Sequence, residues 1–259
     1  MIAFSIKKTF FDLWDNMFKI GALNLGFLIS ISLAVIVPTG ITANRPIKIL
    51  IFLLGVLWCF IYAAAAARSL SVISDRGSFT FSLFVKNIRA SIADALFSLL
   101  IFGIAAIVLC LVVPFYLKTG SFAGIVLAQT YGWFLLISIM VFQFFFAART
   151  RLDGALPLSL KKLVMIFFDN PLFCIASLII CIIGIVLSVF TVFLFPGPAG
   201  ILLYLDEAFR LRLLKYDWLE SQNDKTDAKR AVPWNDILEE EREIIGNRGL
   251  KNLIFPWKD

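Results

Sequence analysis

Long apolar stretches dominate this chain and restrict what it can fold into. Five of them exceed about 20 residues, the length that a helix needs to cross the ~30 Å hydrocarbon core of a bilayer. They lie at residues 20–40, 47–67, 95–117, 122–148 and 172–195. Because backbone N–H and C=O groups must be paired inside lipid, each stretch is predicted to be a membrane-spanning helix. The predicted fold class is therefore all-α, a polytopic helical membrane protein.

The composition supports this class and excludes several kinds of chemistry. Of the 259 residues, 60% are hydrophobic and 16% are charged, whereas a soluble domain carries about 25% charged residues. The chain has no histidine and no G-x-x-x-x-G-K-[ST] phosphate loop, which excludes histidine triads, imidazole metal sites and that mode of nucleotide binding. The four cysteines lie within apolar stretches and are interpreted as small apolar residues. We expect no enzymatic activity, no cofactor and no metal.

The distribution of lysine and arginine predicts the orientation in the membrane. If the N-terminus is cytoplasmic, the inner residues are Lys7, Lys8, Lys19, Arg68, Arg76, Lys86, Arg89, Arg149, Arg151, Lys161 and Lys162, and the outer ones are Arg45, Lys48 and Lys118. Such an excess is typical of cytoplasmic loops, so the net charge of +6 indicates topology rather than nucleic-acid binding. We expect a protein of the bacterial cytoplasmic (inner) membrane, without a cleavable signal, with both termini in the cytoplasm.

A weak three-fold repeat runs through the chain. In each unit a lysine precedes an aspartate by eight residues, and an apolar stretch begins soon afterwards. The matching pairs are Lys7 and Asp15, Lys86 and Asp94, and Lys161 and Asp169. The segment before each stretch has the apolar spacing of an amphipathic helix in the membrane interface. We predict three parallel repeats of interfacial helix plus transmembrane hairpin. The alternative is that unrelated membrane entries converged on similar lysines and helix caps.

Local signals at these entries predict particular contacts. The three repeat pairs are candidate ion pairs, with either a structural role or the role of a gate. Lys8 and Asp12 are spaced i, i+4 on one helix, a spacing that adds a few tenths of a kcal/mol. Asn170 before Pro171 is typical of an N-cap and the first helical residue, and Asp94 is expected to cap in the same way.

The end of the apolar region leaves two topologies open. Residues 195–198 read Phe-Pro-Gly-Pro and interrupt the fifth stretch. The segment 199–210 that follows contains Asp206 and Glu207, which makes it a poor spanning helix. The repeat predicts a short sixth span that returns to the cytoplasm, with Arg210 pairing with these acids within the helix. The alternative is five spans plus an interfacial helix.

Polar side chains within or beside the spans are candidates for a polar path. They are Asn24, Gln129, Gln143, Asp206 and Glu207. Ionisable residues at membrane depth are functional candidates, and amides there either line a path or hydrogen-bond neighbouring helices.

The last part of the chain differs in composition and predicts separate segments. The transmembrane domain covers residues 1–215, a polar linker 216–232, and a cytoplasmic tail 233–259. In the tail, Asn235 is expected to cap a short helix over 236–245. The candidate docking residues are Trp234, Leu253, Phe255 and Trp257. They bind either this chain's own surface and the lipid interface, or a cytoplasmic or membrane protein partner.

The layout resembles the YesL-type family of small bacterial multi-pass membrane proteins. The resemblance covers about residues 5–215. Its motifs are residues 10–14 (Phe-Phe-Asp-Leu-Trp) leading to 24–25 (Asn-Leu), 84–87 (Phe-Val-Lys-Asn), 169–171 (Asp-Asn-Pro) and 195–198 (Phe-Pro-Gly-Pro). Members of this family look like companions of carbohydrate ABC importers, and the resemblance implies an accessory role and no catalytic residue. The tail looks like an addition to the family pattern.

These observations favour a non-enzymatic membrane protein. We expect an accessory or scaffold subunit of a transport system, with carbohydrate ABC import as the system that the resemblance implies. The alternative is a self-contained small-solute transporter whose path runs between the three hairpins.

Overall fold

The computed structural model describes residues 1–152, 154–221 and 232–245, and every element in these ranges is a helix. Five of the helices are long and apolar enough to cross a membrane. They are α2 (Met17–Gly40), α3 (Arg45–Ser74), the continuous segment Ile92–Lys118, the segment Phe122–Arg151 and α10 (Pro171–Phe190). The five predicted stretches are therefore confirmed as helices of spanning length, although the second continues to Ser74 and the fifth ends at Phe190.

Two of the spanning segments contain an irregularity. Ile92–Lys118 comprises α5 (Ile92–Ile107), a π-helical turn (Val108–Val112) and α6 (Val113–Lys118). Phe122–Arg151 comprises α7 (Phe122–Phe142) and, after a turn, α8 (Phe145–Arg151). Helices α2 and α3 form one hairpin, and the segment α5–α6 forms a second hairpin with α7.

A shorter helix precedes each hairpin entry. These helices are α1 (Ile2–Asp15), α4 (Phe81–Ala90) and α9 (Leu156–Asp169), at the three places where an amphipathic helix was expected. Asn170 is the N-cap residue of α10 and Pro171 its first residue, as predicted. The prediction for Asp94 was wrong, because Ser91 occupies the N-cap position of α5 and Asp94 lies inside its first turn.

Helix α11 (Gly197–Ser221) occupies the middle of the structure. It contacts α1, α2, α3, α8 and α10, and seven successive residues, 203–209, are buried. Seven residues make about two turns, so α11 is covered on all sides over this length. It is not among the five helices that meet the criteria for a span. It continues six residues beyond the domain boundary expected at residue 215.

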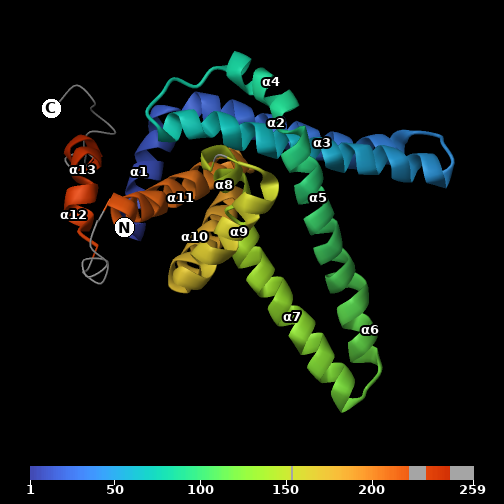
Figure 1. The fold of residues 1–259 in the computed structure, drawn as a ribbon. Helices are drawn as coiled ribbons and strands as arrows, with labels where there is room; N and C mark the ends of the chain where they lie inside the picture. Colours follow the sequence, from blue (N-terminus) through green and yellow to red (C-terminus); the bar gives the residue numbers. More distant parts are fainter. Residues whose placement is uncertain (153, 222–231, 246–259) are drawn as a thin grey trace.

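The two long hairpins diverge from a common base (Figure 1). α8, α9, α10 and α11 gather at this base, and the far ends of α2–α3 and of α6–α7 extend away from it. Large apolar side chains are exposed on the extended parts; Phe102 is 61%, Phe115 64% and Phe122 83% exposed. Apolar exposure on this scale is unfavourable in water and favourable in lipid, which supports a multi-pass membrane protein.

The described part of the tail forms two short helices and not one. These are α12 (Trp234–Ile237) and α13 (Glu239–Ile245), separated by Leu238, which is fully buried. Asn235 lies inside α12, and its Oδ1 accepts a hydrogen bond of 2.6 Å from Arg242. The expected cap at Asn235 and single helix over 236–245 were therefore wrong.

Candidate functional site

Charged side chains from four helices and one turn meet at the base of the hairpins. We call this set the ionic cluster; its members are Lys8, Asp12, Asp75, Arg76, Arg151, Asp206, Glu207, Arg210 and Glu241. They come from α1, the turn that follows α3, the end of α8, α11 and α13. Segments far apart in the sequence are thus joined at one place.

Lys8 forms the most deeply buried ion pair of the cluster, with Glu207. Both side chains are 0% exposed. The Lys8 Nζ also donates hydrogen bonds to Asp12 Oδ2 at 2.8 Å and to the Ser74 carbonyl oxygen at 2.9 Å. The i, i+4 contact of Lys8 with Asp12 was predicted and is confirmed. A buried ammonium with three oxygen acceptors ties α1 to both α11 and α3.

Arg151 and Asp206 form a second pair with two parallel hydrogen bonds. The guanidinium Nε lies 2.9 Å from Asp206 Oδ1, and Nη2 donates to Oδ2 and, at 2.7 Å, to Ser74 Oγ. Nη1 donates to Asp75 Oδ1 at 3.1 Å. Two parallel bonds from one guanidinium fix direction as well as charge, so this pair sets how α8 approaches α11 and α3.

Arg210 connects the tail to the cluster. Its Nε lies 3.1 Å from Asp75 Oδ1, and its Nη2 lies 2.7 Å from Glu241 Oε1. Arg76 Nη2 donates to the other Glu241 oxygen at 2.7 Å. Burial opposes ionisation of Glu241, but the hydrogen bonds from Arg76 and Arg210 outweigh it and lower the pKa of this carboxyl below its ordinary value. In place of the predicted pairing with the acids of its own helix, Arg210 binds Asp75, directly after α3, and Glu241 of α13.

Two smaller ion groups lie outside the ionic cluster. The Asp94 side chain is 3% exposed and forms ion pairs with two arginines. One is Arg68, and the other is Arg149, whose Nε lies 2.7 Å from Asp94 Oδ1. Asp169 accepts hydrogen bonds from Tyr216 Oη at 2.7 Å and from Lys215 Nζ at 2.9 Å. The hydrogen bond from Tyr216 is the main cause that lowers the pKa of Asp169, and burial opposes it.

The structure gives Asp94 and Asp169 partners other than the lysines of their repeat units, while the pairing of Lys7 with Asp15 stays a prediction. The carboxylates of Asp94 and Asp169 are held as described above, while Lys86 and Lys161 are exposed on α4 and α9. Lys7 lies over the Phe11 ring at 5.9 Å, and Asp15 is exposed at the end of α1. The lysine of α1 that belongs to the ionic cluster is Lys8, the residue after Lys7.

The candidates for a polar path do not come together. Asn24 Nδ2 donates to the carbonyl oxygens of Leu194 and Pro196, and its Oδ1 accepts from Ala199 N at 2.8 Å. Gln143 Nε2 donates to backbone oxygens of Met140 and Cys174, and Gln129 is exposed on α7. Asn24 therefore fastens α2 to the α10–α11 connection, and only Asp206 and Glu207 of the five share a site.

Of the docking candidates in the tail, Trp234 contacts the chain itself. Trp234 lies 6.0 Å from the Arg212 guanidinium of the same chain, whereas Leu253, Phe255 and Trp257 lie outside the described residues. Leu238 and Ile245 are buried, so this part of the tail packs onto the membrane domain.

A polar cavity of about 380 Å³ adjoins the ionic cluster. Ser71, Asp75, Arg151, Arg210 and Asp217 are among its lining residues. Within the part of the chain that the structure covers, no group of three or more Cys, Asp and Glu side chains has the arrangement of a metal site. The charged groups of the ionic cluster pair with one another, and these ion pairs hold the helices in fixed positions relative to each other.

Comparison of the chain with family models, with curated proteins and with solved structures finds no match. The five apolar helices define the class, a helical multi-pass membrane protein. The residues that sequence reasoning missed are Asp75, Arg76, Arg151 and Glu241. Their signal was only that they are charged residues close to helix ends.

Proposed function

We propose that this protein is a non-enzymatic accessory or scaffold subunit of a membrane transport system. It lies in the bacterial cytoplasmic membrane, with both termini and the ionic cluster on the cytoplasmic side. Helix α11 serves as the sixth span, and the chain is built from three repeats of interfacial helix and hairpin. The resemblance to YesL-type proteins makes carbohydrate ABC import the first system to test.

The observation that carries this proposal is the concentration of charged groups and tail contacts at one end of the hairpins. The connections at the far ends of the two long hairpins are short, at residues 41–44 and 119–121. A surface that recognises a protein partner needs aromatic or charged side chains that project from the bilayer. In this chain the aromatic and charged side chains that a partner could contact lie at the base of the hairpins, on or near α4, α9 and the tail.

The repeat is supported by the ion group around Asp94. Arg68 and Arg149 follow matching Ala-Ala dipeptides at the ends of the first two hairpins. Both arginines bind the same carboxylate, at the start of the second hairpin. Equivalent positions in two repeats would meet at one acceptor if the hairpins are related by a rotation about a common axis.

In this account the tail has two parts with different tasks. Glu241, Leu238 and Ile245 hold α12 and α13 on the membrane domain. The apolar end with Leu253, Phe255 and Trp257 is the segment proposed to bind the partner, since aromatic anchors contribute most of the binding energy of small interfaces.

Co-purification in mild detergent tests this division. Full-length protein is compared with a version that ends at Ile245, which keeps the ion pairs of Glu241, and with a version that ends at Ser221, which loses them. The full chain is expected to recover an ATPase or another transport subunit, identified by mass spectrometry, and both shortened versions are expected to lose it. Recovery of the same subunit by the version ending at Ile245 would contradict the assignment to the last residues.

A second candidate function, a small-solute transporter, has one observation in its favour. The polar cavity of about 380 Å³ beside Arg151 and Arg210 is large enough for a small solute. Uptake of labelled sugars and amino acids into liposomes that contain the purified protein alone tests it. Saturable uptake that Arg210→Gln abolishes would favour the transporter over the accessory subunit.

A further inference from the structure

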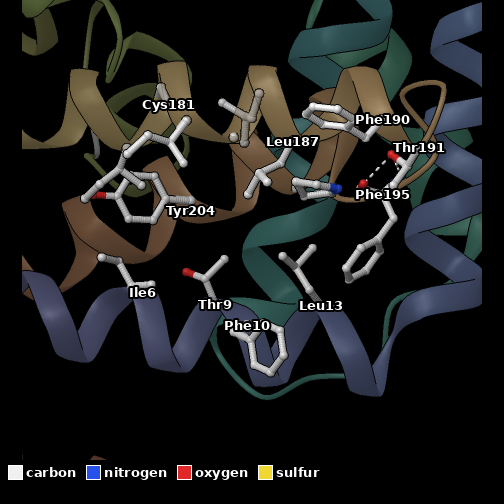
Figure 2. A pocket seen from close by; sticks show the side chains of 16 residues that line it. Ile6, Thr9, Phe10, Leu13, Cys181, Leu187, Phe190, Thr191, Phe195 and Tyr204 are labelled. Carbon is white, nitrogen blue, oxygen red and sulfur yellow. Dashed lines mark hydrogen bonds between the residues drawn. The ribbon is translucent and has the colours of Figure 1, made fainter.

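An apolar groove lies between α1, α10 and α11 (Figure 2). Its volume is about 570 Å³, within the range of about 300–1,000 Å³ that is typical of ligand sites. Its walls include Ile6 and Leu13 from α1, Leu187 and Phe190 from α10, and Ile201 and Tyr204 from α11. The groove is separate from the ionic cluster, which lies on the side of α1 that carries Lys8.

The chemistry of the groove suits a hydrocarbon chain and not a polar solute. Its lining is almost entirely carbon, and the Thr9 hydroxyl that contributes to it is buried and has no hydrogen-bond partner among the described residues. A sugar or an ion would lose its water without gaining partners there. Leu187 is 52% and Phe190 82% exposed, and both belong to a spanning helix, so the mouth opens at the depth of the lipid chains.

The Arg212 guanidinium lies further along the same helices, where it interacts electrostatically with the Asp169 carboxylate but forms no ion pair among the described residues. The Arg212 guanidinium stacks 4.4 Å from the centroid of the Phe173 ring. Its Nε is buried and has no hydrogen-bond partner in the described ranges, and the ion pairs found there do not include it. An arginine in this state attracts an anion such as a phosphate.

Helix geometry places Arg212 and the groove on one seam between α10 and α11. Gly184 and Ile201 face each other in the groove, since a Cβ on Gly184 would lie 3.4 Å from Ile201 Cγ1. On α11, Arg212 follows Ile201 by 11 residues. On α10, Phe173 precedes Gly184 by 11 residues. Eleven residues make about three helical turns, so on both helices the arginine level lies ~16 Å from the groove level. Met1 and Ile2 pack on the hydrophobic cluster that contains Phe173, so α1 flanks the seam at both levels.

We propose that this seam binds one anionic phospholipid, with an acyl chain in the groove and the phosphate at Arg212. The separation of ~16 Å suits a molecule that joins a phosphate to a long chain. Arg212 lies toward the base of the hairpins, at the level where lipid headgroups meet cytoplasmic cations.

Native mass spectrometry of the full-length protein tests this site. The protein is reconstituted in vesicles of equal phosphatidylglycerol and phosphatidylethanolamine and then extracted in mild detergent. One phosphatidylglycerol is expected to remain bound per chain. Gly184→Leu, which fills the groove, is expected to reduce its retention at least tenfold. The matched control is Gly132→Leu on α7, where a Cβ has nothing within 4 Å, and it is expected to retain the lipid.

Two further variants separate the chain site from the headgroup site. Arg212→Gln is expected to keep one bound lipid but to lose the preference for phosphatidylglycerol over phosphatidylethanolamine. The control is Arg89→Gln, at an exposed position, and it is expected to keep this preference. If Gly184→Leu fails to fold, Leu187→Trp narrows the mouth from its exposed side and is expected to give the same loss. Equal retention by groove variants and the Gly132→Leu control would overturn the proposal, as would an unchanged lipid preference in Arg212→Gln.

Discussion

Removing one partner of the Lys8–Glu207 pair is expected to destabilise the protein more than any exposed charge change. Both side chains are 0% exposed, so the remaining charge cannot recover water. Loss of one member of a buried pair costs about 3–5 kcal/mol. The variants are Lys8→Met and Glu207→Gln.

The surroundings of the pair predict which variant is worse. In Glu207→Gln the lysine keeps Asp12 at 2.8 Å and the Ser74 carbonyl at 2.9 Å, so the cost falls at the lower end, about 3 kcal/mol. In Lys8→Met the carboxylate of Glu207 loses its ion-pair partner, and its other oxygen, Oε2, has no hydrogen-bond partner in the described structure. This variant is expected near about 5 kcal/mol.

Thermal unfolding of the detergent-solubilised protein measures these effects. For a chain of this size a loss of about 1 kcal/mol lowers Tm by ~2–4 °C. The two variants are therefore expected to lower Tm by about 6–20 °C, and Lys8→Met is expected to have the lower Tm of the two. Lys86→Met is the matched control, because Lys86 is exposed on α4, and it is expected to change stability by less than about 0.5 kcal/mol.

The double variant Lys8→Met/Glu207→Leu completes the thermodynamic cycle. It removes both charges and is expected to be more stable than Lys8→Met alone, because no buried charge is left without a partner. Additive losses in the double variant, or a Tm for Lys8→Met equal to that of the Lys86→Met control, would refute the reasoning.

Three other predictions use the same thermal assay. Asp94→Asn is expected to cost about 2–3 kcal/mol because two arginines lose a charged acceptor, and a loss under about 0.5 kcal/mol would contradict the contact. Asn24→Leu is expected to cost about 1–3 kcal/mol, since it leaves the Leu194 carbonyl and the Ala199 N–H without the Asn24 side chain. The Pro196 carbonyl keeps its hydrogen bond from Gly200 N. Gln129→Leu on the exposed face of α7 is expected to be neutral. The folded pKa of Glu241 is lowered, so its stabilisation is complete above its unfolded pKa of about 4.3 and disappears as the pH falls through the folded value. The Tm difference between wild type and Glu241→Gln should therefore be present at neutral pH and vanish in acid; a difference that persists in acid would exclude this ion pair as its cause.

The membrane helices could be predicted from the sequence because hydrophobicity and length act locally. A run of apolar residues is helical in lipid whatever its neighbours are. For the same reason the amphipathic segments before each hairpin entry were found at α1, α4 and α9. The ends of α3 and α10, the caps at Asp94 and Asn235 and the division of the tail into two helices differed from prediction, since helix ends depend on competing local contacts.

The ionic cluster could not be predicted because its partners are distant in sequence. Lys8 and Glu207 are 199 positions apart, and Arg151 and Asp206 are 55 apart. The repeat drew attention to Lys7, but successive residues on a helix point about 100° apart, and only the packing of α1 on α11 determines that Lys8 faces inward. Glu207 was found as a candidate, because a carboxylate in an apolar region is costly unless it is paired.

The central claim, that the end of the tail binds a transport subunit, is tested most directly by photo-crosslinking in living cells. A photoreactive phenylalanine replaces Trp257, and the control carries it in place of Trp133, which is exposed on α7. The account predicts a crosslink from position 257 to a membrane transport protein or its ATPase, absent from position 133. Crosslinks from position 257 that reach only this chain or lipid would contradict it.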